Sequence, residues 1–282
     1  MQWREVKAVM TRLAVDRHHV QVRGAGSPAL VFAHGFGCDQ TMWRFVAPAF
    51  EATHRVVLYD HAGCGAADPV PADDPRHASL EGYASDLLDI LDELQLHDVV
   101  LVGHSVGSVI GLLAALRDPA RFRSLVLVAP SPRFLNDPPD YVGGFDPADL
   151  EGLFALMDSN HFGWAQFLAP LAIGETNPVE QTREFEAQLC ALDPEATGRF
   201  ARLVFYVDIR DRLPQVAVPS LIIQCTRDSI APPEVGRYIE QQLPRSRLVE
   251  VEASGHCPHV THPVQTIAIL RQALQDLDAP DA

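Results

Sequence analysis

The chain has few basic residues, no long apolar run and no paired set of cysteines. Its 282 residues include 22 Lys and Arg against 37 Asp and Glu, which gives a formal net charge of −15. A surface of that sign repels phosphate groups, so neither nucleic acid nor an anionic membrane is expected as a partner. The charge is equally compatible with solubility alone. We expect a small, neutral ligand.

Two further absences bear on location. Residues 1–10 lack the apolar run of roughly 7 to 15 residues that a secretory signal requires, and no segment approaches a transmembrane span. The five cysteines are an odd number without a paired framework, which suits reduced thiols. We therefore predict a cytoplasmic protein.

Apolar runs rich in β-branched residues alternate with helix-like stretches. The predicted strands are 19–22, 29–33, 55–60, 99–102, 125–129, 221–225 and 248–251. Several are apolar almost throughout, as central strands covered on both faces are. Segments 80–94, 106–116 and 264–274 place apolar residues on one helical face. The pattern predicts an α/β fold with a mostly parallel sheet flanked by helices.

The strand rhythm stops between residues 131 and 213. Helix-like patterns there cover 147–157, 161–171, 178–192 and 194–207, and three of them have a proline near the start. We predict an α/β core of residues 1–130 and 214–282, interrupted by a helical cap at 131–213.

The strongest chemical signal is the run Gly103-His104-Ser105-Val106-Gly107, between an apolar strand and a helical segment. A G-x-S-x-G string alone recurs by chance in loops rich in serine and glycine. At a strand-to-helix junction it indicates a nucleophile elbow, in which a strained turn presents the serine hydroxyl at the carboxyl edge of the sheet. We predict Ser105 to be the nucleophile.

A serine hydroxyl needs a neighbouring base and a group that orients the base. Asp228 follows the strand 221–225, and His256 follows Gly255 after the strand 248–251. Serine, acid and histidine in this chain order are typical of the fold. Alternatively, Asp228 could cap the helix announced by Pro232 and Pro233.

The spacing of His256, His259 and His262 around Cys257 also raises the possibility of a zinc site. There is no second ligand cluster, and the neighbouring prolines argue against a ligand-bearing helix. We predict no metal and no cofactor, and His256 as the base.

The run Ala33-His34-Gly35-Phe36-Gly37 ends the strand 29–33 and supplies an early loop. In this fold the developing oxyanion is bound by two backbone N–H groups, here predicted to be those of Phe36 and Val106. A phosphate cradle is the alternative, but the loop lacks both the P-loop Lys-Ser/Thr and the G-x-G-x-x-G spacing.

Several motifs together carry a family resemblance. They are the run 35–40, the elbow, the stretch 131–137, the run Gly143-Gly144-Phe145 and the stretch 255–259. In combination they resemble the RsbQ-like α/β-hydrolases, a group that includes a bacterial stress-response regulator and the plant karrikin- and strigolactone-receptor hydrolases. The similarity runs from about Thr11 to Leu274.

The resemblance implies a V-shaped cap of four helices over a hydrophobic cavity, with the triad at its floor. The implied pocket residues are Phe36, His104, Phe134, Trp164, Leu168 and Phe205. Position 168 is a leucine where the plant receptors carry phenylalanine, which changes the expected shape of the cavity.

Two functions follow. The first is a serine hydrolase that cleaves a small hydrophobic ester or lactone through Ser105, His256 and Asp228. The second, implied by the resemblance, is a signalling regulator that binds or slowly hydrolyses such a ligand and acts on a partner protein. Dehalogenases and epoxide hydrolases carry aspartate at the elbow, so Ser105 argues against both. A haloperoxidase or perhydrolase side activity stays open.

Overall fold

The structure is a computed structural model that describes residues 12–278. Residues 1–10, on which the predicted lack of a secretory segment depends, lie outside the described residues. From residue 12 to residue 278, no helix combines the length and the apolar character that crossing a membrane would need.

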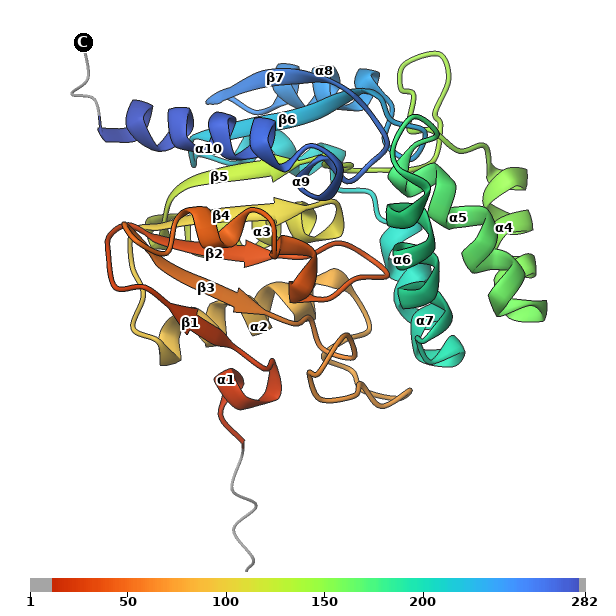
Figure 1. Cartoon of the computed structure of the whole chain (residues 1–282), viewed down its shortest axis with the longest axis horizontal. Coiled ribbons are helices and arrows are strands. Elements are labelled where there is room, and N and C mark those ends of the chain that lie inside the picture. Colours follow the sequence, from red (N-terminus) through yellow and green to blue (C-terminus); the bar gives the residue numbers. More distant parts are fainter. Residues whose placement is uncertain (1–11, 279–282) are drawn as a thin grey trace, which may run out of the picture.

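A seven-stranded sheet forms the centre of the described chain (Figure 1). Its strands are β1 (Gln21–Arg23), β2 (Ala29–Ala33), β3 (Arg55–Tyr59), β4 (Val99–His104), β5 (Phe122–Val128), β6 (Ser220–Arg227) and β7 (Ser246–Ser254). They lie in the order β1-β3-β2-β4-β5-β6-β7. Only β1 runs antiparallel to its neighbour, and all other pairs are parallel. The predicted α/β fold with a mostly parallel sheet is confirmed.

Helices cover both faces of the sheet, which is why the central strands are largely apolar. Every residue of β2 and β4 is buried, and alternate residues of each strand join two separate core clusters. One cluster includes side chains of α2 (Leu80–Glu93), α3 (Val106–Arg117) and α8 (Pro233–Gln242), and the other those of α10 (Pro263–Asp278). The short helices α1 (Ala14–Arg17) and α9 (Pro258–Thr261) complete the described core.

The first predicted strand, 19–22, is wrong at its start. His19 has φ +46°, and the N–H groups of His19 and Val20 donate to carbonyls of Asp16 and Val15 at the end of α1. These two residues form the turn that closes α1, so strand β1 begins only at Gln21. Hydropathy alone does not reveal such a left-handed turn.

Four helices follow one another between β5 and β6. They are α4 (Pro147–Ser159), α5 (His161–Ile173), α6 (Val179–Cys190) and α7 (Pro194–Phe205). Figure 1 shows them stacked at the carboxyl ends of the parallel strands, where α/β ligands bind. All four fall within the segment 131–213; its division from the core as a separate cap domain stays a prediction.

A cluster of charged groups holds the loop before α2. His77 Nδ1 lies 2.6 Å from Asp74 Oδ2, and its Nε2 lies 2.7 Å from Asp86 Oδ2. Burial acts to lower the pKa of His77, but its hydrogen bonds to Asp86 and Asp74 outweigh burial and raise it. Burial likewise acts to raise the pKa of Asp86, yet bonds from His18 and His77 bring it well below its usual range. His77 therefore fastens this loop to α2, and most strongly when its ring is protonated.

Replacing His77 with glutamine should destabilise the fold more at pH 5.5 than at pH 9. Because the pKa of His77 is raised on folding, its stabilising charge is fully present below the unfolded pKa of about 6.5 and is lost as the pH rises through the folded value. Asp86, with a lowered pKa, is still ionised at pH 5.5. Urea unfolding at both pH values measures the effect, with exposed His97→Gln as the control. An equal loss at both pH values would contradict it.

Candidate active site

Ser105 lies in a strained turn between β4 and α3. Its φ of +53° and ψ of −117° are values that residues with a side chain rarely adopt. The turn requires glycine on both sides, because a Cβ at Gly103 would lie 2.6 Å from the Gly107 carbonyl oxygen and one at Gly107 would lie 2.5 Å from that of Ala33. The Ser105 side chain makes no capping bond to α3, so its hydroxyl is not used to begin the helix.

This geometry predicts an unusual stability order at position 105. Ser105→Gly should unfold about 1 kcal/mol less readily than Ser105→Ala, because only glycine adopts this conformation without strain of about 1–3 kcal/mol, offset in part by its more flexible unfolded chain. Urea unfolding of the two variants measures the difference. Equal or reversed stabilities would show that the elbow is not strained.

Asp228 follows β6 directly and is completely buried. Its Oδ1 accepts hydrogen bonds from the N–H groups of Ile230 at 2.8 Å and Ala231 at 3.0 Å. Its Oδ2 accepts one from Nδ1 of His256 at 2.7 Å. The alternative role as a helix cap is not what the structure shows, since the N-cap of α8 is Pro232 and has no capping side chain. The carboxylate is held by the turn before the helix.

His256 lies in the loop after β7, which bends at Gly255 with φ +94°. A Cβ at Gly255 would lie 2.1 Å from the carbonyl oxygen of Ile173, so the loop passes against the end of α5. The His256 N–H donates to Ala172 O at 2.7 Å. With the Nδ1 proton directed at Asp228, Nε2 carries the lone pair, and this buried atom has no hydrogen-bond partner among the described residues.

The two neighbouring histidines are placed differently. The His259 ring is fully buried between Trp43, with ring centroids 4.4 Å apart, and His104, at 4.3 Å. Burial lowers the pKa of His259 to about 3, so the ring stays neutral. His262 Nδ1 lies 2.8 Å from Thr261 Oγ1. Within residues 12–278 no group of three or more His, Cys, Asp and Glu could hold a metal ion.

Ser105 and His256 line a common cavity of about 30 Å³, which we call the catalytic cavity. Of the predicted pocket residues, the lining includes Phe36, His104, Phe134, Leu168 and Phe205. The exception is Trp164, which is buried outside the lining, with its ring edge against Phe36 at 6.1 Å and stacked on His161. It supports the wall from behind, because the Phe36 ring fills the position nearer the cavity.

Other lining residues were not identified from the sequence. They are Cys38, Ala172, Phe185, Val204, Ile230 and Cys257. Cys38 and Cys257 could have been predicted as lining residues, because they lie close to Phe36 and His256 in the chain. The others come from α5, α6, α7 and the turn after Asp228, and only the packing of the helices on the core brings them here.

The charge state of the cavity wall leaves few reactive groups. Burial raises the pKa of the Cys38 and Cys257 thiols, so neither supplies a thiolate. Burial, together with the nearby His259 and His256, lowers the pKa of His104 far below its usual value. The neutral His104 ring lies with Nε2 2.9 Å from His256 O, which fastens the His256 loop to the elbow. No pattern in the sequence predicts this contact between His104 and the His256 carbonyl.

A serine on a strand-to-helix elbow, together with a buried Asp–His pair at the carboxyl edge of a mostly parallel sheet, defines an α/β hydrolase. The family model of the alpha/beta hydrolase fold matches residues 28–263. The chain therefore belongs to the α/β-hydrolase family.

Individual relatives agree with this assignment. A probable esterase of Oryza sativa subsp. japonica is 41% identical over 92% of this chain and 96% of its own length. A strigolactone esterase of Arabidopsis thaliana is 39% identical over 91% of this chain and 96% of its own. A karrikin insensitive 2 receptor of Petunia hybrida is 38% identical over 90% of this chain and 94% of its own length. The predicted resemblance to the karrikin and strigolactone group is confirmed.

Among solved structures, a hydrolase from Oleispira antarctica is 41% identical, has a TM-score of 0.90, and matches 93% of this chain and 96% of its own. The predicted enzyme class, an ester hydrolase, is thus confirmed at the level of the family.

Proposed function

We propose that the protein hydrolyses a small, neutral, hydrophobic ester or lactone through a triad of Ser105, His256 and Asp228. One observation carries the proposal. The hydrogen bond of 2.7 Å between His256 Nδ1 and Asp228 Oδ2 leaves His256 Nε2 without a partner among the described residues, in the cavity that Ser105 also lines. The apolar lining and the net charge of −15 favour a neutral substrate.

In the proposed first half-reaction, Ser105 Oγ attacks the carbonyl carbon while His256 Nε2 takes its proton. The N–H groups of Phe36 and Val106 stabilise the negative oxygen. Val106 is the first residue of α3, so the positive end of the helix dipole adds to its effect. The tetrahedral intermediate then expels the alcohol, which receives the proton from His256.

In the second half-reaction, His256 takes a proton from water, whose oxygen attacks the acyl carbon. The bond to Ser105 breaks, Oγ regains the proton, and the carboxylic acid leaves. Asp228 keeps its negative charge throughout and stabilises the imidazolium in both half-reactions. One water is consumed for each acid and alcohol formed.

The covalent intermediate provides the direct test. A fluorophosphonate, which mimics the tetrahedral intermediate, should phosphonylate the protein with loss of fluoride and so add the inhibitor mass less that of HF, and peptide mapping should place the group on Ser105. Denatured protein is the control, because only the folded triad activates the hydroxyl. Labelling of another residue, or equal labelling after denaturation, would refute the proposal.

A signalling role is a second candidate for two reasons. Some relatives are named as receptors. In addition, the loop that carries His256, the proposed base, contacts the end of α5 in the predicted cap. The His256 N–H donates to Ala172 O near the end of α5, and Asn177 Nδ2 binds both Ile173 O and Ser254 O. Movement of the His256 loop during turnover would therefore be transmitted to α5. Ligand-dependent capture of a partner protein in a pull-down, abolished by cap-surface variants that keep hydrolysis intact, would establish the role.

We further propose a cytoplasmic location. All five cysteines are free, and burial raises the pKa of every one of them. Reduced thiols of this kind suit a reducing compartment. Cell fractionation with an antibody against the protein tests the location.

A further inference from the structure

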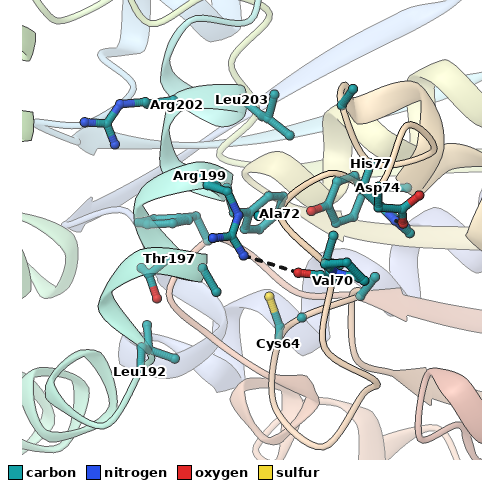
Figure 2. A pocket seen from close by; sticks show the side chains of 18 of the residues that line it. Cys64, Val70, Ala72, Asp74, His77, Leu192, Thr197, Arg199, Arg202 and Leu203 are labelled. Atoms are coloured by element: carbon teal, nitrogen blue, oxygen red, sulfur yellow. Dashed lines mark hydrogen bonds and ion pairs between the residues drawn. The ribbon is translucent and has the colours of Figure 1, made fainter.

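A second, larger cavity lies beside the catalytic cavity. It has a volume of about 430 Å³ and lies between the loop 62–78 and helix α7, and we call it the α7 cavity. Figure 2 shows Arg199 of α7 reaching across it to the loop, where its Nη2 donates to Val70 O at 3.2 Å. The volume falls in the range of about 300–1,000 Å³ that is usual for small-molecule sites.

Among residues 12–278, only Phe36 and Cys38 line both cavities. The Phe36 ring lies between the two, with its centroid 5.9 Å from the ring of Phe200, which lines the α7 cavity, and 5.9 Å from that of Phe205, which lines the catalytic cavity. The Phe36 side chain is therefore part of the wall between the two spaces. The proposed oxyanion donor is the backbone of this same residue.

The lining of the α7 cavity is suited to an uncharged group. Arg199 is bound to Glu195 as well as to Val70 O, and Arg202 to Asp158. His77 has a carboxylate on each nitrogen. Since these charges are neutralised within the protein, they do not call for an ionic ligand. The remaining wall includes the exposed Asp73 but is otherwise largely apolar, with Val70, Tyr83, Phe200 and Leu203.

The catalytic cavity, at about 30 Å³, is less than a tenth of the volume of the α7 cavity. A cavity this much smaller leaves little room for a chain or ring attached to a carbonyl at Ser105. We propose that the α7 cavity binds the apolar acyl tail of the substrate, whose carbonyl lies at Ser105, once the Phe36 ring has turned aside. This inference rests on the proposed esterase function and assigns its substrate class as medium-chain or ring-bearing acyl esters.

The test compares nitrophenyl acetate with nitrophenyl octanoate. Ala196 lines only the α7 cavity, so Ala196→Trp fills it without reaching the triad. Exposed Ala155 of α4 lines neither cavity, and Ala155→Trp is the matched control. Each buried methylene contributes roughly fourfold to binding. The ratio of kcat/KM for octanoate to that for acetate should therefore fall about tenfold or more in Ala196→Trp and stay constant in Ala155→Trp.

A second variant should have the opposite effect on this ratio, because it removes the ring that separates the two cavities. Phe36→Ala should raise the octanoate-to-acetate ratio by about tenfold, because the tail no longer has to displace the ring. An unchanged ratio in Ala196→Trp, or in soluble, folded Phe36→Ala, would overturn the tail site. Failure of the proposed esterase function would give a different result. Ser105→Ala would then hydrolyse each of the two esters at the wild-type rate.

Discussion

Replacing Ser105 with alanine is expected to lower kcat for nitrophenyl acetate by about four to six orders of magnitude. The alanine variant keeps the cavity and the backbone N–H groups but cannot form the acyl-enzyme, and loss of a triad nucleophile typically has an effect of this size. Initial rates at saturating ester measure the change. Because the oxyanion donors are intact, a small residual rate above that of water is expected.

The matched control is Ser159→Ala, which removes a hydroxyl from an exposed helix end where Oγ binds only the carbonyls of Ala155 and Leu156. It should keep the wild-type rate. Circular dichroism of Ser105→Ala should match the wild type. A fall in kcat of less than about tenfold in a folded variant would mean that another group is the nucleophile.

Asp228→Asn should lower kcat about 10⁴-fold, the second largest effect that we predict, while preserving the shape of the cavity. The asparagine amide can present N–H where the carboxylate accepted one, so His256 would take the tautomer with the proton on Nε2. It could then no longer accept a proton from Ser105. The buried carboxylate is also the only group bound to His256 Nδ1 in the described chain, so the imidazolium would lose its counter-charge.

Asp140→Asn is the control, since Asp140 is exposed in a loop. The reduced rate of Asp228→Asn should rise with pH, because hydroxide can replace the missing general base. If Asp228→Asn kept wild-type kcat, the only role of Asp228 would be to stabilise the turn at Ile230 and Ala231.

The order of elements and the candidate triad were accessible from the sequence because local rules determine them. Apolar strands of β-branched residues, the small residues around Ser105, and an acid and a histidine after later strands each leave a local signature. The fold class and the family followed from these signatures. Strand ends were less accurate, as at His19, where a left-handed turn replaces the expected strand.

The cavity could be predicted only in part. Phe36, His104, Phe134, Leu168 and Phe205 line it, but Trp164 lies behind the wall, and aromatic character alone does not distinguish a lining residue from a supporting one. The contact of His104 with the carbonyl of His256 joins residues far apart in the chain. Such contacts depend on how elements pack, which hydropathy does not encode.

The sequence by itself thus determined the α/β class, the elbow at Ser105 and the chain order of Ser105, Asp228 and His256, because each depends on a few neighbouring residues. Only the tertiary structure decided that Asp228 meets His256 at 2.7 Å rather than capping α8, and that the Phe36 ring separates a small catalytic cavity from the α7 cavity. The physical reason is that both outcomes depend on the packing of distant elements. No local propensity specifies which helix comes to lie over which strand end.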